Sequence, residues 1–118
     1  MKFEQVEAWD TVKGLSKEDL LETLFSLSRA EADAYFKIQG KTASVQKFAT
    51  LAGCDRTSAQ RFLKRFVDKG LAVREAEKRE KGGITFHYKT RAFQDVKPDL
   101  FNKLDYWYSL TKERIKYL

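Results

Sequence analysis

The chain has one cysteine, one histidine, one proline and no long apolar run. A single cysteine cannot form an intrachain disulfide, and Cys54 is compatible with a reducing compartment. No stretch of about 18 apolar residues predicts a membrane helix, and the first residues do not resemble a signal peptide. No Pro/Gly/Ser-rich linker divides the chain. We therefore expect a cytoplasmic protein, associated with the nucleoid if it binds DNA, and no membrane partner.

Residues that could support catalysis or metal binding are also scarce. No His, Cys, Asp and Glu side chains cluster at ligand spacing, so we predict no metal site. No Ser/His/Asp or Cys/His arrangement and no phosphate-binding glycine loop is present, so we predict neither an enzyme nor a cofactor. His87 should lie on the outer face of a strand. Cys54 should pack inward as a small apolar side chain, with a redox sensor as the alternative.

The composition is that of a folded, basic protein. Of 118 residues, 42% are hydrophobic, which is enough to build one modest core. Lysine and arginine exceed the acids by 23 to 17, for a net charge of +6. We expect a single domain over 1–118, with its core at about 16–92. Basic charge alone is weak evidence for a nucleic-acid partner, so the positions of the cations matter more.

Helical signals dominate the first two thirds of the chain. Phe3, Val6 and Trp9 are spaced for a short helix within 2–13. Ser16 and Ser28 each begin a helix, and Glu31 completes a capping box with Ser28. Together with the strands described below, these signals predict a mainly α fold with a small β-hairpin, an α+β class.

Two further helices form a candidate helix-turn-helix. Ser44 caps the first, Gly53 ends it and Asp55 caps the second, predicted over 56–69. One side of that second helix is apolar at helical spacing: Ala59, Phe62, Leu63, Phe66 and Val67. The opposite side is polar and basic. This division is what a recognition helix needs, because one side anchors it while the other reaches DNA.

A basic hairpin follows the recognition helix. Residues 71–73 are predicted as a short strand, and a second strand is predicted over 84–88, where apolar and polar residues alternate. Gly82-Gly83 can supply the positive φ values of a tight turn between them. The segment at about 77–84 is the predicted wing, although Glu77 and Glu80 dilute its charge. The sequence therefore predicts a winged helix-turn-helix with N- and C-terminal dimerisation helices.

The candidate DNA-binding residues follow from these positions. Residues placed to reach base edges are Arg56, Thr57, Ser58, Gln60 and Arg61. Residues placed to meet phosphate are Ser44 at a helix start, Lys64 and Arg65. In the wing, Arg79 and Lys81 are placed to reach the neighbouring minor groove or the DNA backbone. A solvated helix face and a merely solubilising hairpin are the competing interpretations.

A long final helix is predicted over 98–118, with Pro98 in its first turn. Its apolar seam suits association with a second copy, through Leu100, Phe101, Leu104, Trp107, Tyr108, Thr111, Ile115 and Leu118. A ligand pocket or base-stacking platform made of Tyr106, Trp107, Tyr108 and Tyr117 is the less favoured interpretation.

The segment 27–88 resembles a known family. The matching residues are Leu27-Ser28-Arg29-Ala30-Glu31-Ala32-Asp33-Ala34-Tyr35, Thr42-Ala43-Ser44, Phe48-Ala49, Ala52-Gly53, Arg56-Thr57-Ser58 and Asp68-Lys69-Gly70-Leu71. They are similar to short archaeal winged-helix transcription regulators of the TrmB-like group, with the MarR-like regulators as relatives. The resemblance implies a recognition helix in the major groove, a wing on the backbone or minor groove, and dimerisation through terminal helices. Asp55 stands where proline is frequent, and the chain has no room for a sugar-binding domain, so no sugar effector is implied.

We therefore expect a homodimeric, sequence-selective regulator that binds double-stranded DNA, with any small-molecule effector unknown. Two alternatives remain open at this stage. The chain could be a protein-interaction winged-helix module of a transcription or chromatin complex, or a non-specific architectural DNA binder.

Overall fold

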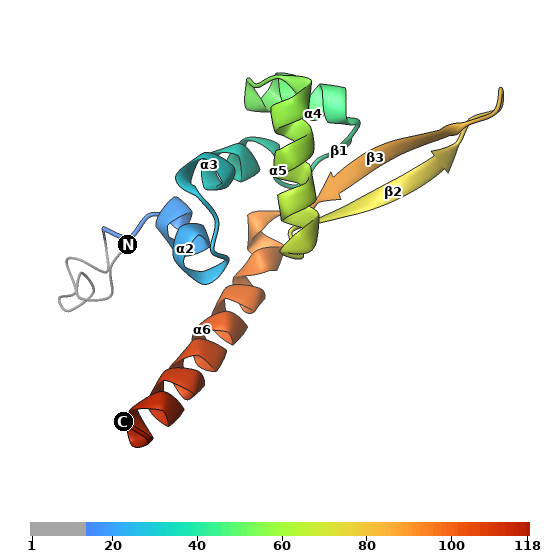
Figure 1. The fold of residues 1–118 in the computed structure, drawn as a ribbon. Helices are drawn as coiled ribbons and strands as arrows, with labels where there is room; N and C mark the ends of the chain where they lie inside the picture. Colours follow the sequence, from blue (N-terminus) through green and yellow to red (C-terminus); the bar gives the residue numbers. More distant parts are fainter. Residues whose placement is uncertain (1–13) are drawn as a thin grey trace.

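A computed structural model of the chain describes residues 14–118 (Figure 1). The helix predicted within 2–13, and with it the N-terminal dimerisation helix, lies outside the described residues. The elements run in the order α2 (Lys17–Leu24), α3 (Arg29–Ile38), β1 (Thr42–Ala43), α4 (Val45–Ala52), α5 (Arg56–Asp68), β2 (Ala72–Lys78), β3 (Ile84–Thr90) and α6 (Phe93–Lys116). Helices α3, α4 and α5 pack together, while the β2–β3 hairpin and α6 project away from them in different directions.

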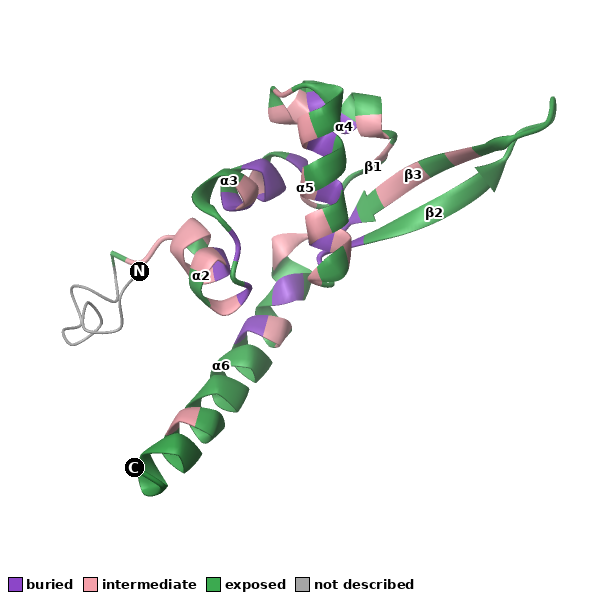
Figure 2. Ribbon diagram, in the orientation of Figure 1, coloured by how far each residue is buried: buried purple, intermediate pink, exposed green. Residues whose placement is uncertain are grey.

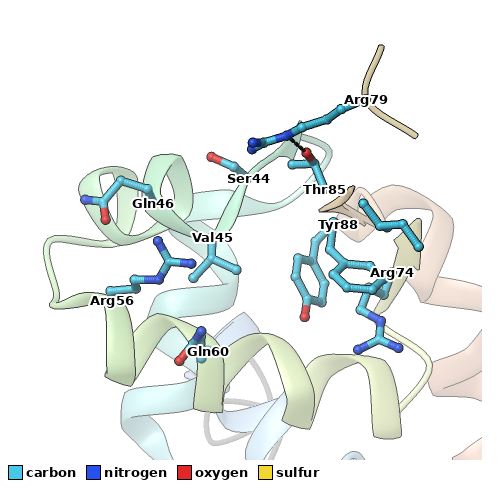
Figure 3. Close-up of a pocket in the computed structure, with 11 residues that line it drawn as sticks. Ser44, Val45, Gln46, Arg56, Gln60, Arg74, Arg79, Thr85 and Tyr88 are labelled. Atoms are coloured by element: carbon cyan, nitrogen blue, oxygen red, sulfur yellow. Dashed lines mark hydrogen bonds between the residues drawn. The ribbon is translucent and has the colours of Figure 1, made fainter. Parts of the chain in front are cut away.

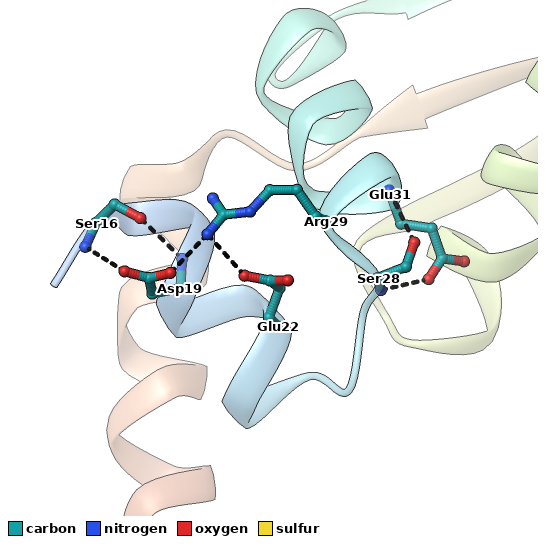
Figure 4. Close-up of polar contacts among 6 residues, drawn as sticks. All are labelled: Ser16, Asp19, Glu22, Ser28, Arg29 and Glu31. Carbon is teal, nitrogen blue, oxygen red and sulfur yellow. Dashed lines mark hydrogen bonds and ion pairs between the residues drawn. The ribbon is translucent and has the colours of Figure 1, made fainter. Parts of the chain in front are cut away.

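The helices begin where side chains can satisfy the first free backbone amides. The hydroxyl of Ser16 accepts from the Asp19 amide at 3.0 Å, and the Asp19 carboxylate accepts from the Ser16 amide at 3.0 Å. Ser28 and Glu31 form the same reciprocal pair at the start of α3, which confirms the predicted capping box. Arg29 then joins the two helices, because its guanidinium contacts Asp19 at 2.6 Å and Glu22 at 2.9 Å (Figure 4).

The core lies where α2, α3, α4 and α5 meet the base of the hairpin (Figure 2). Its largest fully buried side chains are Tyr35, Phe25, Phe48 and Phe66. The rings of Tyr35 and Phe66 meet edge to face with centroids 5.9 Å apart. The Tyr35 hydroxyl donates to the Arg91 carbonyl at 2.6 Å, and burial raises the pKa of this phenol. The apolar side predicted for the helix over 56–69 is thus the side by which α5 is anchored in the core.

Three antiparallel strands form a sheet in the order β1-β3-β2. The two-residue strand β1 was not predicted, because Thr42 and Ala43 show no periodicity; Thr42 pairs with Lys89. The hairpin strands are longer than predicted, at seven residues each, and the turn between them includes Gly82 at φ +91°. Three packed helices followed by a projecting hairpin confirm the predicted winged helix-turn-helix fold.

The C-terminal helix begins five residues before Pro98, so the predicted start near residue 98 is wrong. The Phe93 amide donates to the Gln39 side chain at 2.5 Å, and Val96 is fully buried. These contacts stabilise the turns before Pro98, even though proline removes one helical hydrogen bond. The helix has 24 residues and is therefore about 36 Å long.

Candidate nucleic-acid interface

The polar side of α5 is open to solvent along its length. The side chains predicted to reach DNA that the structure leaves exposed are Arg56, Thr57, Gln60, Arg61 and Lys64, with Ser58 half-buried. On the other side, Ala59, Leu63 and Phe66 are buried. No element of the described chain covers the polar side, so it is accessible to a partner.

The start of α5 is fixed by its cap. The Asp55 carboxylate accepts from the Ser58 amide at 2.6 Å, as predicted for an N-cap. That backbone hydrogen bond is the main cause of a lowered pKa for Asp55. Before it, Gly53 takes the left-handed conformation at φ +71°, which lets the chain reverse between α4 and α5. Cys54 in this turn is half-buried, rather than fully packed inward as predicted.

Arg65 differs from its predicted role. Its guanidinium contacts the Glu31 carboxylate at 3.4 Å and donates to the Ser26 carbonyl at 2.8 Å. These contacts direct the side chain toward the start of α3 within its own chain. The prediction that Arg65 meets phosphate is therefore not supported. Sequence spacing alone could not show that acceptors from α3 and from the loop between α2 and α3 lie beside it.

The wing and α5 enclose a groove of about 520 Å³ (Figure 3). Predicted site residues that line it are Ser44, Arg56, Gln60 and Arg79. The Ser44 hydroxyl also caps α4 by accepting from the Lys47 amide at 3.3 Å. The Arg79 guanidinium donates to the Thr85 hydroxyl, which holds this side chain along β3. Lys81 is exposed in the turn of the hairpin and does not line the groove.

Several groove residues were missed by sequence reasoning: Val45, Gln46, Arg74, Ile84, Thr85, Phe86 and Tyr88. Arg74 is the most informative, because its guanidinium stacks over the Phe86 ring at 4.5 Å. The segment after Val73 lacks apolar alternation, so no strand was predicted there. Extending the hairpin pairing outward from Gly82-Gly83 to equal lengths would have found it.

The pleat of the hairpin sorts its charges between two faces. Arg74, Ala76 and Lys78 pair with Tyr88, Phe86 and Ile84, and paired residues share a face. Glu75 and Glu77 are on the other face, where their carboxylates lie 3.0 and 3.6 Å from the two ring nitrogens of His87. His87 thus points away from the groove, as predicted. The carboxylates of Glu75 and Glu77 therefore do not line the groove.

Helix α6 presents a second uncovered surface. Predicted dimerisation residues with large exposed fractions are Phe101 (67%), Leu104 (47%), Trp107 (43%), Tyr108 (57%), Ile115 (63%) and Leu118 (83%). Thr111 is half-buried, and its hydroxyl donates to the Trp107 carbonyl at 2.8 Å. Leu100 is the exception, because it is 8% exposed and belongs to the core of its own chain. Leu100 is therefore not available to a second chain.

No helix in the described part is long and apolar enough to cross a membrane. Over residues 14–118, no group of three or more His, Cys, Asp or Glu side chains is arranged to hold a metal ion.

Comparison with known proteins supports the fold. The chain is similar to a solved structure titled a possible transcriptional regulator from Methanosarcina mazei Go1, with 15% identity, a TM-score of 0.72, and coverage of 87% of this chain and 88% of that one. It is also similar to the ST1889 protein of the thermoacidophilic archaeon Sulfolobus tokodaii, with 16% identity, a TM-score of 0.61, and coverage of 80% and 94%. No protein-family model and no curated protein matches the sequence. At these identities the similarity establishes a shared architecture.

Proposed function

We propose that this chain is a transcription regulator that binds double-stranded DNA in a sequence-selective way, with α5 in the major groove. The observation that supports this most is the exposure of Thr57, Arg61 and Lys64 on a helix whose other side is anchored in the core. An α-helix fits the major groove, and side chains near its N-terminus reach base edges there. The Methanosarcina mazei neighbour is named as a possible transcriptional regulator, which agrees with this proposal.

The roles of individual side chains follow from their place on α5. Arg56, Gln60 and Arg61 have the length and donors to read base edges from the first two turns. Lys64 lies one turn after Gln60, so we assign it to phosphate. The N-terminus of α4, capped by Ser44, points its free amides toward a second phosphate. The wing adds Arg79 and Lys81, which we assign to the DNA backbone or minor groove next to the major groove that holds α5.

A homodimer is part of this proposal. Exposed apolar side chains recur along most of α6, beyond the point where it leaves the core. A continuous patch of this kind is rare on a monomer, and a second copy of α6 would cover it through the same side chains. Two recognition helices would then meet successive major grooves about 34 Å apart on a two-fold site. We also propose that residues 1–118 form one domain and that the chain is related to the TrmB-like or MarR-like regulators.

Selection of bound duplexes from a random pool, at near-physiological salt, tests the proposal. We expect enrichment of a motif with two-fold symmetry. Arg61→Ala should weaken the selected site by about 1–3 kcal/mol and relax the preference at one base pair. Lys64→Ala should weaken all duplexes alike, because a phosphate contact is independent of sequence.

Lys97→Ala on α6 is the matched control, since it removes one exposed cation far from α5 in sequence. It should bind like the parent. A pool that yields no motif, although the protein binds every duplex equally, would instead identify an architectural binder. A stable monomer that binds no duplex and captures another protein would identify an interaction module.

A further inference from the structure

The groove between the hairpin and α5 runs along an edge of the sheet. Ile84, Thr85 and Phe86 all line it, although consecutive side chains of a strand point to opposite faces. A groove that contacts three consecutive residues follows the edge of β3 rather than either face. On that edge, β1 pairs with β3 only from Tyr88 onward. Residues 84–87, which we call the open edge, therefore have no strand beside them on this side in the described part of the chain.

The hydrogen-bond pattern shows which backbone groups point into the groove. In an antiparallel pair, alternate residues direct both their N–H and their C=O groups to the same neighbouring strand. The Thr90 amide donates to the Lys41 carbonyl, just before β1, at 2.9 Å, so Thr90 directs its backbone groups away from β2. Ile84 and Phe86 precede Thr90 by an even number of residues and do the same. Their two N–H and two C=O groups therefore point out from the open edge.

An edge of this kind binds an extended polypeptide by strand addition. Each suitably placed residue of an added strand offers one donor and one acceptor, which satisfies an N–H and a C=O group together. A phosphate of DNA can accept from the N–H groups but has no donor for the C=O groups. The open edge therefore complements a protein strand better than it complements a nucleic-acid backbone.

The side chains around the open edge favour an acidic partner. Figure 3 shows Arg56, Arg74 and Arg79 around the groove, from α5, β2 and the turn of the hairpin. Of the described residues that line the groove, none is acidic. Ile84 and Phe86 add apolar surface there, because their side chains are 65% and 42% exposed. An extended segment that carries both acidic and apolar side chains matches these features.

The strands of a second copy fit this edge poorly. The sequence of β2 has two acids and two cations, and that of β3 has one cation and no acid. Neither strand offers net negative charge to the three arginines. The charge of the groove therefore favours a different protein as the partner.

We propose that the open edge binds an acidic, extended segment of another protein, which adds to the sheet as a strand beside residues 84–87. The bound segment covers Arg56, Gln60 and Arg79, which also line this groove. The proposed function assigns these same side chains to DNA, so the acidic segment and DNA exclude each other. The strand addition stands on the geometry of β3, whereas the competition with DNA rests on the proposed function.

Binding of a synthetic peptide tests the strand addition. The probe is a fluorescent peptide in which glutamate alternates with valine, and its anisotropy reports binding. The parent chain should bind it, with an affinity that falls as salt rises, because salt screens the attraction between arginine and glutamate. The control peptide has the same side chains but methylated backbone nitrogens, so it keeps the charge and lacks the N–H donors. It should bind about tenfold more weakly.

Proline substitutions test the same edge from the protein side. Ile84→Pro removes an N–H group that points away from β2, so the bonds between β2 and β3 stay intact. It should weaken peptide binding about fivefold, and Ile84→Ala, which keeps the N–H group, should weaken it less. Ala76→Pro is the matched control, because Ala76 pairs with Phe86 and directs its N–H group to the opposite edge of the hairpin. It should bind the peptide like the parent.

A duplex that carries the selected site provides the competition experiment. The unlabelled peptide should release this duplex from the parent chain, and the methylated peptide at the same concentration should not. Absence of peptide binding, equal binding of the two peptides, or equal losses from Ile84→Pro and Ala76→Pro would overturn the strand addition. A duplex that stays bound at saturating peptide refutes the competition. A parent that binds the peptide but no duplex refutes the proposed function and supports the strand addition.

Discussion

Arg91 joins the end of α5 to α6, and its removal is the most informative test of how the fold is held together. The guanidinium donates to three acceptors: the Gly70 carbonyl at 3.0 Å, the Asp95 carbonyl at 2.9 Å and the Asp99 carboxylate at 2.6 Å. Gly70 follows the end of α5, whereas Asp95 and Asp99 belong to α6. We expect Arg91→Met to loosen this junction while keeping the aliphatic part of the side chain.

The size of the stability loss in Arg91→Met depends on how well water can replace these hydrogen bonds. A hydrogen bond to a charged group contributes about 1.5–3 kcal/mol when it is shielded. Here the side chains of Arg91 and Asp99 remain 32% and 40% exposed, so water compensates for much of the loss. We expect the free energy of unfolding to fall by about 2 kcal/mol, with the urea midpoint reduced and the m-value unchanged.

Arg114→Met is the control for this experiment. Arg114 is exposed in the last turn of α6, so its replacement should change the free energy of unfolding by less than about 0.5 kcal/mol. If Arg91→Met unfolds like the parent, the three bonds do not stabilise the junction. In the proposed dimer, Arg91→Met should also broaden the preferred spacing between DNA half-sites, because α6 would no longer be held at one angle to α5.

Substitutions at three other positions test the helix-turn-helix. Phe66→Ala should lower the free energy of unfolding by about 3–5 kcal/mol, because Phe66 is fully buried; a loss below about 1 kcal/mol in urea titration would contradict its place in the core. Gly53→Ala should destabilise by about 1–2 kcal/mol through its left-handed backbone alone, since a Cβ there meets no atom within 4 Å; Gly53→Asn, which tolerates that conformation, should be milder in thermal unfolding. The pKa of Asp55 is lowered in the folded state by the Ser58 amide, so the folded chain holds its proton less tightly than the unfolded chain. The cap therefore stabilises fully above the ordinary value of 3.8 and is lost as pH falls through the lower folded pKa. The stability difference between parent and Asp55→Ala should vanish in acid, whereas Asp55→Asn should show no such dependence.

Local signals in the sequence were sufficient for the helical part of the fold. Ser16, Ser28, Ser44 and Asp55 all cap helices as predicted, because a capping bond links residues only three positions apart. Gly53 ends α4 for an equally local reason. The apolar stripe and the exposed polar side of α5 also follow from its own periodicity. The candidate residues Arg56, Gln60 and Arg61 could therefore be proposed without a structure.

Other features depend on residues far apart in the sequence. Arg65 is held by Glu31 and Ser26, which the packing of α5 against α3 brings near although they lie more than 30 residues earlier in the sequence. The groove gains Arg74 because β2 continues for as long as β3 pairs with it.

Local sequence signals were enough to predict where α2, α3, α4 and α5 begin and which side of α5 stays polar, since each depends on neighbours within a turn or two. Contacts between distant segments produce the strand β1, the early start of α6, the burial of Leu100 and the separation of charges on the two faces of the hairpin. Each of these depends on a pairing or packing partner in another element, and the spacing of residues along a chain does not specify that partner.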